Sequence, residues 1–274
     1  MTQVPSLSLN NGNQIPQLGF GVWQVEPDEV EKAIGAALDA GYRHIDTAAM
    51  YGNEEGVGRA IAASGIDRGE LFVTTKLNND AHGEDEAVAA LEESLGKLGL
   101  DYVDLYLIHW PLPGLDRYVE SWRGFEKLYA DGKARSIGVS NFHENHLNRL
   151  ATEADVTPAV NQVEVHPFFT QTALRQVNAD RGILTEAWTP LGRGDLESPT
   201  IGGIAEELGK SPAQVVLRWH VQLGNVVFPK SVTPSRIVEN FDIFDFELSD
   251  AQVTSITALD EGARTGPNPD EFLS

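Results

Sequence analysis

The sequence predicts a (β/α)8 barrel, a closed parallel sheet surrounded by helices. Its 274 residues are close to the ~250 typical of one such barrel. Short apolar runs rich in β-branched residues alternate about eight times with stretches of helical period. The runs are apolar throughout, as in strands that are covered on both faces. Such an alternation indicates parallel strands joined by helices, and eight repeats suffice to close a barrel. No low-complexity segment or long linker interrupts the chain, so we expect residues 1–274 to form a single domain.

The repeat assigns each strand and helix to a residue range. We predict strands at 17–21, the weakest of the apolar runs, and at 42–46, 71–76, 103–109, 135–140, 159–165, 184–188 and 226–230. The amphipathic stretches predict helices at 28–39, 53–64, 85–98, 118–131, 144–154, 173–181, 213–223 and 235–241.

Three segments lie outside the repeat. Residues 7–15, with Asn11–Gly12 at their centre, predict a β-hairpin with a type I′ turn, which we expect to cap the N-terminal end of the barrel. Residues 249–259 predict one more helix. The tail 262–274 is rich in Gly, Pro and Asp and is expected to be an ordered or semi-ordered loop.

Composition narrows the class of partner. The formal net charge of −21 argues against DNA, RNA or an anionic membrane as a general partner, because each would be repelled. An anionic cofactor would therefore need a local cluster of positive groups. Cysteine is absent, which excludes disulfides and thiolate chemistry and fits a cytoplasmic protein. No signal peptide is indicated, and no apolar run approaches the ~18 residues of a membrane span.

Polar side chains follow three neighbouring predicted strands. Asp46, Lys76 and His109 stand at the C-terminal ends of the second, third and fourth strands, and Tyr51 follows in the loop after Asp46. In a barrel these strand ends share one rim, where active sites are found. Each residue alone has a simpler interpretation: a solvated loop position for the aspartate or lysine, a buried structural histidine, or a packed tyrosine. Their joint placement favours a catalytic site.

The four residue types suit proton donation to a carbonyl oxygen. A tyrosine has a pKa of about 10, so it donates a proton poorly near neutrality unless its phenolate is stabilised. An ammonium group within hydrogen-bond reach provides that stabilisation, and an aspartate orients the ammonium. Asp46, Lys76 and Tyr51 would form such a relay without a metal, and neutral His109 would donate to the substrate oxygen.

Segments along nearly the whole chain resemble the aldo-keto reductase superfamily in order and spacing: GYRHIDTAAMYGNEEGVGRAI, TTKL, DLYLIHWP, IGVSNF, PAVNQVEVHP and VVFPKS. The resemblance is strongest to bacterial enzymes of the 2,5-diketo-D-gluconate reductase type. It implies a (β/α)8 barrel, NADPH as the cofactor, and Asp46, Tyr51, Lys76 and His109 as a catalytic tetrad.

Two other phosphate-binding patterns are absent. No G-x-G-x-x-G follows any predicted strand. The stretch 203–211 ends in Gly-Lys-Ser, but five residues separate its glycines where a P-loop has four, and it follows a helical pattern.

The family resemblance implies a different cofactor site, carried over position by position. Gly21, Val22 and Trp23 match the loop that borders the nicotinamide, near Asp46. Ser140, Asn141 and Gln162 are expected to hold the carboxamide. Trp188 is expected to stack on the nicotinamide ring, and Leu191 and Gly192 to lie against the pyrophosphate.

The segment PKSVTPSRIVEN matches the part of the family that holds the 2′-phosphate and adenine of NADPH. Positive groups here would stand at a helix N-terminus, which favours an anion. The residues implied are Lys230, Ser231, Val232 and Arg236 for the phosphate, and Glu239 and Asn240 for the adenine. Thr233 departs from the family, which often has a basic residue there, so selectivity for the phosphate is expected to be weaker. A surface helix cap with incidental basic residues is the simpler alternative.

The implied substrate pocket is lined by Trp23, Tyr51, Asn78, His109 and Trp110. Relatives commonly have tryptophan in place of Asn78, so a wider or more polar wall is expected there. The loop 111–117 is short, which argues against a steroid-sized groove. We expect reduction of small aldehydes, α-dicarbonyls or keto-sugar acids, by a monomer.

Two other classes of protein remain as alternatives. One is a metal-dependent barrel hydrolase, whose ligands would be drawn from His44, Asp46, His109, His166 and His220. The positions disfavour it, because no H-x-H pair ends the first strand and His220 lies in a helical pattern. The other is a non-catalytic, nicotinamide-binding regulatory barrel, against which the presence of all four tetrad residues argues.

Overall fold

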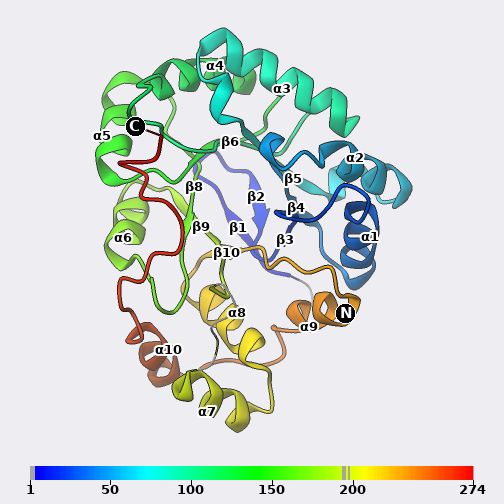
Figure 1. The fold of residues 1–274 in the computed structure, drawn as a ribbon, viewed down its shortest axis with the longest axis vertical. Helices are drawn as coiled ribbons and strands as arrows, with labels where there is room; N and C mark the ends of the chain where they lie inside the picture. The colour runs from blue at the N-terminus through cyan, green and yellow to red at the C-terminus, as the bar shows by residue number, and fades with distance from the viewer. Residues whose placement is uncertain (1–3, 193–195, 197, 274) are drawn as a thin grey trace.

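The computed structural model describes residues 4–192, 196 and 198–273 and shows a barrel of parallel strands enclosed by helices (Figure 1). Each strand pairs in parallel with its neighbour in sequence, so strand order in the sheet follows chain order. This confirms the predicted (β/α)8 barrel. The strands are β3 (Phe20–Gly21), β4 (His44–Asp46), β5 (Phe72–Leu77), β6 (Leu105–Ile108), β7 (Ile137–Ser140), β8 (Val160–Glu164), β9 (Leu184–Trp188) and β10 (Val226–Val227).

Backbone contacts between the first and last strands close the barrel. Leu18 forms a parallel bridge with Val227. The Gly19 N–H donates to the carbonyl oxygen of Val227 at 2.8 Å, and the Val227 N–H donates to that of Gln17 at 3.0 Å. The weak apolar run at 17–21 is therefore a genuine barrel strand.

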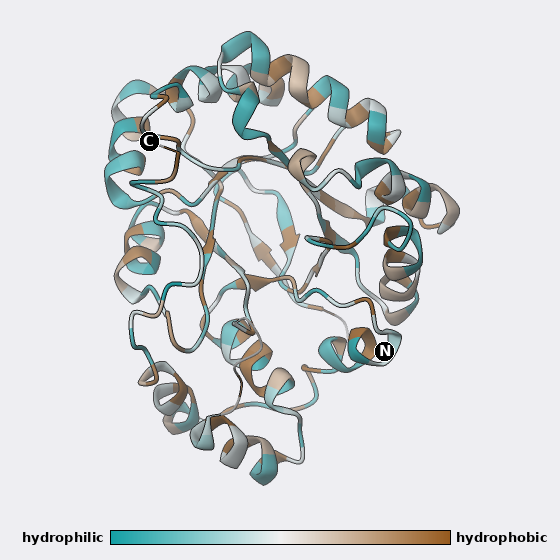
Figure 2. Cartoon of the chain, in the orientation of Figure 1, coloured by the Kyte–Doolittle hydropathy of each residue, from teal (hydrophilic) through white to brown (hydrophobic). Residues whose placement is uncertain are grey.

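The helices pack their apolar faces onto the barrel and turn polar residues outward (Figure 2). All eight predicted crossover helices are present, with bounds within a few residues of the prediction. Their bounds are α1 (Val30–Ala40), α2 (Glu54–Ala63), α3 (Glu84–Leu98), α4 (Tyr118–Ala130), α5 (Glu144–Glu153), α6 (Thr172–Asp180), α8 (Pro212–Gln222) and α9 (Pro234–Phe241), and the predicted final helix is α10 (Asp250–Thr257). No helix in the described ranges is both long and apolar enough to cross a membrane.

One further helix, α7 (Pro199–Leu208), was not predicted. Gly202 and Gly203 lie inside it, and glycine lowers helix propensity by about 1 kcal/mol relative to alanine. Burial of Ile201, Ile204 and Ala205 compensates, because these side chains pack into the main core. Tertiary packing thus overrides the local preference.

A hairpin closes the N-terminal end of the barrel, as predicted, but its turn is not type I′. Strands β1 (Ser6–Ser8) and β2 (Gln14–Pro16) pair antiparallel. The Gly12 N–H donates to the carbonyl oxygen of Leu9 at 3.0 Å, and among the loop residues only Gly12 has a positive φ, of +88°. A type I′ turn needs positive φ at both Asn11 and Gly12; the observed loop is one residue longer, a type I turn followed by a left-handed glycine.

The hairpin is held against the bottom of the barrel by side chains. Asn10 and Asn11 donate to the carbonyl oxygens of Pro158 and Arg135, which precede β8 and β7. Leu9 and Ile15 are buried in a cluster of apolar side chains from the barrel strands. The hairpin thus covers the N-terminal end of the barrel interior, whereas the cavity described below lies at the opposite, C-terminal rim.

Candidate active site

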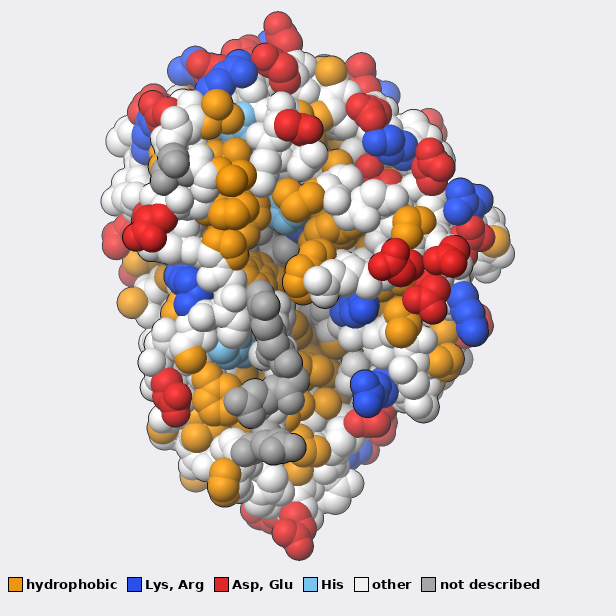
Figure 3. Space-filling model, viewed as in Figure 1, with side chains coloured by type: hydrophobic (Ala, Val, Ile, Leu, Met, Phe, Trp, Pro, Cys, Tyr) orange, Lys and Arg blue, Asp and Glu red, His pale blue; other side chains and the backbone are white. Residues whose placement is uncertain are grey.

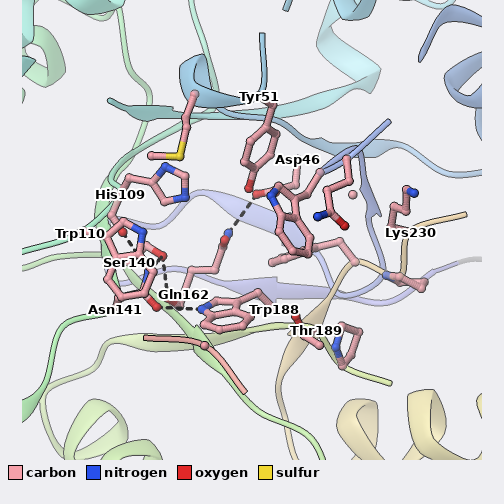
Figure 4. A pocket seen from close by; sticks show the side chains of 18 of the residues that line it. Asp46, Tyr51, His109, Trp110, Ser140, Asn141, Gln162, Trp188, Thr189 and Lys230 are labelled. Carbon is pink, nitrogen blue, oxygen red and sulfur yellow. Dashed lines mark hydrogen bonds between the residues drawn. The ribbon is translucent and has the colours of Figure 1, made fainter. Parts of the chain in front are cut away.

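The structure brings the four predicted catalytic residues together at the C-terminal rim. Figure 4 shows three of them, Asp46, Tyr51 and His109. Asp46 ends β4, Lys76 stands near the end of β5, and His109 directly follows β6. Tyr51 is the last residue of a short 3-10 turn, Ala49–Tyr51, after β4. Because the barrel strands are parallel, their carboxyl ends deliver these side chains to the same place.

Lys76 is the centre of the constellation. Its side chain is fully buried, and its Nζ donates to Asp46 Oδ1 at 2.7 Å, to the Thr47 carbonyl oxygen at 2.9 Å and to the Tyr51 hydroxyl at 3.3 Å. An ammonium group has three hydrogens, so every one is used. The ammonium is therefore fixed in place beside the phenol.

The electrostatics keep Tyr51 protonated and Lys76 charged. Burial raises the pKa of Tyr51 above its usual value, although the nearby Lys76 charge opposes the shift. For Lys76, burial favours the neutral amine, but Asp46 and then Tyr51 outweigh it, and the pKa of the ammonium is raised. At neutral pH the phenol thus carries its proton and faces a permanent cation.

His109 is a neutral imidazole in contact with Tyr51. Burial, and then the Lys76 charge, hold the pKa of His109 well below its usual value. The two rings lie edge to face with centroids 5.9 Å apart. Its backbone carbonyl oxygen accepts a hydrogen bond from Asn141 Nδ2 at 2.9 Å, which ties the position of His109 to the neighbouring strand β7.

A chain of amide and hydroxyl groups continues the site across β7, β8 and β9. Ser140 Oγ donates to the carbonyl oxygen of Gln162 at 2.8 Å, and Asn141 Nδ2 donates to Ser140 Oγ at 3.1 Å. Trp188 Nε1 donates to Asn141 Oδ1 at 2.9 Å. The indole ring is therefore held at the cavity wall by this hydrogen bond, which Figure 4 shows.

These residues surround a cavity of about 510 Å³. Figure 3 shows apolar side chains gathered around the hollow on this face of the molecule. The predicted site residues that line the cavity are Gly21, Trp23, Asp46, Tyr51, His109, Trp110, Ser140, Asn141, Gln162, Trp188, Leu191, Gly192 and Lys230.

Other predicted residues lie outside the lining of this cavity. Val22 is fully buried and its carbonyl oxygen accepts from Asn53 Nδ2. Asn78 Oδ1 accepts from the Asn79 N–H and caps a 3-10 turn, so the structure does not bring it to the cavity wall. The residues beyond β10 that are also outside the lining are Ser231, Val232, Arg236, Glu239 and Asn240.

The segment after β10 carries two exposed positive charges. Lys230 and Arg236 are exposed, and neither forms an ion pair with any carboxylate among the described residues. Arg236 lies in the first turn of α9, where the N-cap is Thr233. Glu239 and Asn240 lie in the last turn of the same helix. In a chain of net charge −21, these two cations and the N-terminus of α9 concentrate positive charge locally.

The C-terminal tail completes the cavity, which its composition did not predict. Gly266, Pro267 and Phe272 line the cavity, and the Phe272 ring lies 4.4 Å from the Trp110 ring, centroid to centroid. Fully buried Glu164 anchors the tail by accepting the Gly266 N–H at 3.0 Å. Residues 262–273 form a loop, but nothing in their Gly- and Pro-rich sequence shows where Phe272 would pack.

The histidines of the metal-hydrolase alternative bind other partners. His44 Nδ1 contacts the carbonyl oxygen of Pro16, and His220 Nε2 contacts that of Pro190. His166 Nε2 is paired with Glu164. Within the residues that the structure describes, no three His, Asp or Glu side chains are arranged to hold a metal ion.

Sequence comparisons identify relatives of the chain. A family model described as the aldo/keto reductase family matches residues 17–261. The chain is 55% identical to an aldo-keto reductase of Mycolicibacterium smegmatis, over 98% of each chain. It is 52% identical to methylglyoxal reductase DkgA of Escherichia coli, over 97% of each chain.

Solved structures agree with the sequence relatives. An aldo/keto reductase from Brucella melitensis superposes with a TM-score of 0.93 at 56% identity, covering 95% of this chain and 99% of that one. An aspartate-to-alanine mutant of Gox0644 in complex with NADPH has a TM-score of 0.95 at 44% identity, covering 98% of this chain and 99% of that one.

Proposed function

Because this chain belongs to the aldo/keto reductase family, we propose that it reduces small aldehydes, α-dicarbonyls or keto-sugar acids to alcohols with Tyr51 as the proton donor. The enzyme is an NADPH-dependent oxidoreductase. One observation carries the proposal of a proton donor. Tyr51 lines the cavity, its raised pKa keeps the phenol protonated at neutral pH, and its hydroxyl lies 3.3 Å from the buried Lys76 ammonium.

Proton donation by Tyr51 would proceed through groups already in contact. As the carbonyl oxygen gains negative charge, the phenol transfers its proton to that oxygen, and the O–H bond of Tyr51 breaks while that of the alcohol forms. The phenolate left behind is stabilised by Lys76, whose charge Asp46 holds in place at 2.7 Å. Neutral His109 can donate a hydrogen bond to the same carbonyl oxygen and so orient it.

The cavity fits a nicotinamide dinucleotide. Trp188 offers a flat ring fixed by Asn141, and the side-chain amides of Asn141 and Gln162 are suited to a carboxamide. Lys230 and Arg236 provide the local positive charge that a phosphate needs. When bound, NADPH supplies the hydride that reduces the carbonyl carbon. The chain's own residues would hold the ring, the carboxamide and the phosphate, and exclude water from the reacting carbon.

The walls of the cavity suit a small substrate. Trp23, Trp110 and Phe272 contribute aromatic surface to the lining of the cavity. The bound cofactor would take part of the 510 Å³, so a short aldehyde or dicarbonyl fits the remainder better than a steroid ketone. Among the relatives, a protein named methylglyoxal reductase is consistent with this class of substrate.

The proposal is tested by the oxidation of NADPH with phenylglyoxal and methylglyoxal, compared with a steroid ketone. We expect rapid turnover of the two dicarbonyls, little with the steroid, and no effect of a chelator, because the relay uses no metal. A marked preference for the steroid would contradict the proposed substrate class. Tight NADPH binding without turnover of any aldehyde would instead support a non-catalytic regulatory barrel.

Replacing Arg236 with alanine should weaken NADPH binding about tenfold, which is the loss of one charge-assisted hydrogen bond. NADH, which lacks the 2′-phosphate, should bind equally to both proteins. Dissociation constants measured by quenching of tryptophan fluorescence would show the difference. Arg123→Ala is the matched control, because Arg123 is exposed on α4, away from the cavity lining. Equal weakening of both cofactors would exclude a phosphate-binding role for Arg236.

A further inference from the structure

Glu186 is an acidic residue buried inside the barrel next to the relay. It stands in the middle of β9, and its side chain is completely inaccessible to solvent. Gln162 Nε2 donates to Glu186 Oε2 at 2.9 Å and also to Asp46 Oδ2 at 2.9 Å. Two acidic side chains therefore share one amide group. The sequence signal was a single acid within the apolar run 184–188, which sequence analysis did not select.

Among the residues that the structure describes, no cation forms an ion pair with Glu186. The charged groups that act on its carboxyl are Asp46 on β4, which repels a second negative charge, and Lys76 on β5. Lys76 uses its three hydrogens on Asp46, Thr47 and Tyr51, so it has none left for Glu186. On β10, which pairs with β9, the residue opposite Glu186 is the apolar Val226.

These surroundings favour the uncharged acid. An ionised carboxylate buried without a paired cation is costly, and such a group takes up a proton instead. Glu186 Oε1 has no hydrogen-bond partner among the described residues. An ionised Glu186 would therefore have only one of its two carboxylate oxygens hydrogen-bonded. Burial, and then the charge of Asp46, raise the pKa of Glu186 to about 8, although Gln162 and Lys76 oppose the shift.

We propose that Glu186 is a positioning residue that remains uncharged at neutral pH, holds Gln162 against Asp46, and so keeps the Asp46–Lys76 pair set for proton donation by Tyr51. This inference rests on the proposed role of Tyr51. When Glu186 releases its proton to solvent, a second negative charge appears beside Asp46. That charge disfavours the phenolate that Tyr51 must form, and turnover slows.

The pH dependence of turnover tests whether the proton on Glu186 affects proton donation by Tyr51. Between about pH 6.5 and about pH 9.5, kcat of the wild-type enzyme for phenylglyoxal reduction should fall about tenfold, with one-proton dependence, and its midpoint should lie near 8. Glu186→Gln keeps the hydrogen-bonding shape without the titrating proton, so its kcat should be flat over the same range. Glu92→Gln removes one exposed carboxylate and should retain the wild-type profile. A Glu186→Gln profile identical to that of the wild type would overturn the proposal.

Infrared difference spectroscopy measures the proton itself and does not depend on turnover. The carbonyl-stretch band of a protonated carboxylic acid should be present in the wild-type protein at neutral pH, lost above the midpoint, and missing from Glu186→Gln. Absence of that band at neutral pH would overturn the proposal even if turnover varied with pH. If the wild-type protein reduced no carbonyl compound, the proposed function would fail on that result, whereas this band would still decide whether Glu186 holds a proton.

Discussion

Tyr51→Phe should lower kcat for phenylglyoxal about 10²–10⁴-fold, the usual contribution of a positioned general acid. The phenylalanine ring fills the same space beside His109, so only the hydroxyl is lost. The dissociation constant for NADPH should change little, because the hydroxyl contacts Lys76 and the substrate side of the cavity. Turnover and cofactor binding, measured on the same preparation, separate the two effects.

Tyr129→Phe is the matched control for this substitution. Tyr129 is half-buried in the last turn of α4, outside the cavity lining, and should tolerate loss of its hydroxyl without a change in kcat. If Tyr51→Phe retained turnover close to that of the wild type, another group would have to be the proton donor.

Lys76→Met should abolish turnover and also lower the free energy of unfolding by about 3–5 kcal/mol, because it leaves the Asp46 carboxylate buried without a cation. Asp46 keeps one hydrogen bond from Gln162 Nε2, which is too little to compensate for the lost ammonium. Urea denaturation at neutral pH would measure the loss of stability, and the NADPH assay the loss of turnover.

The double variant Asp46→Asn, Lys76→Met separates stability from catalysis. It removes both charges, so it should recover much of the stability lost in Lys76→Met while remaining inactive. A double variant as unstable as the single one would show that loss of packing, rather than the unpaired charge, causes the destabilisation. Activity in either variant would contradict the role of Lys76 in the relay.

The barrel and the proximity of the four proposed catalytic residues could be predicted because both depend on short-range patterns. Apolar runs that alternate with helical periods determine the strand order, since consecutive parallel strands become neighbours. Once that order is given, Asp46, Lys76 and His109 must meet at one rim. The same reasoning does not predict a role for Glu186. A burial pattern alone does not show which buried acid accepts a hydrogen bond from the same Gln162 amide group as Asp46.

The features that were missed depend on tertiary contacts. Helix α7 forms in spite of two glycines because the core accepts its apolar face. The hairpin turn differs from type I′ because one more residue lies between its strands than the Asn-Gly pair suggests. Phe272 reaches the cavity through anchors on Glu164, more than a hundred residues earlier in the chain. Spacing in the sequence carries no signal for such contacts.

The closure of the barrel has a consequence for how the chain folds. The bridge between Leu18 and Val227 joins segments from opposite ends of the protein. During synthesis β3 has a partner on only one side until β10 has left the ribosome, and its other edge stays open to incorrect pairing. Contacts between residues so distant in sequence make folding slow. Refolding is therefore expected to pass through open-barrel intermediates that aggregate at high protein concentration, even though the finished molecule leaves no strand edge unpaired at this seam.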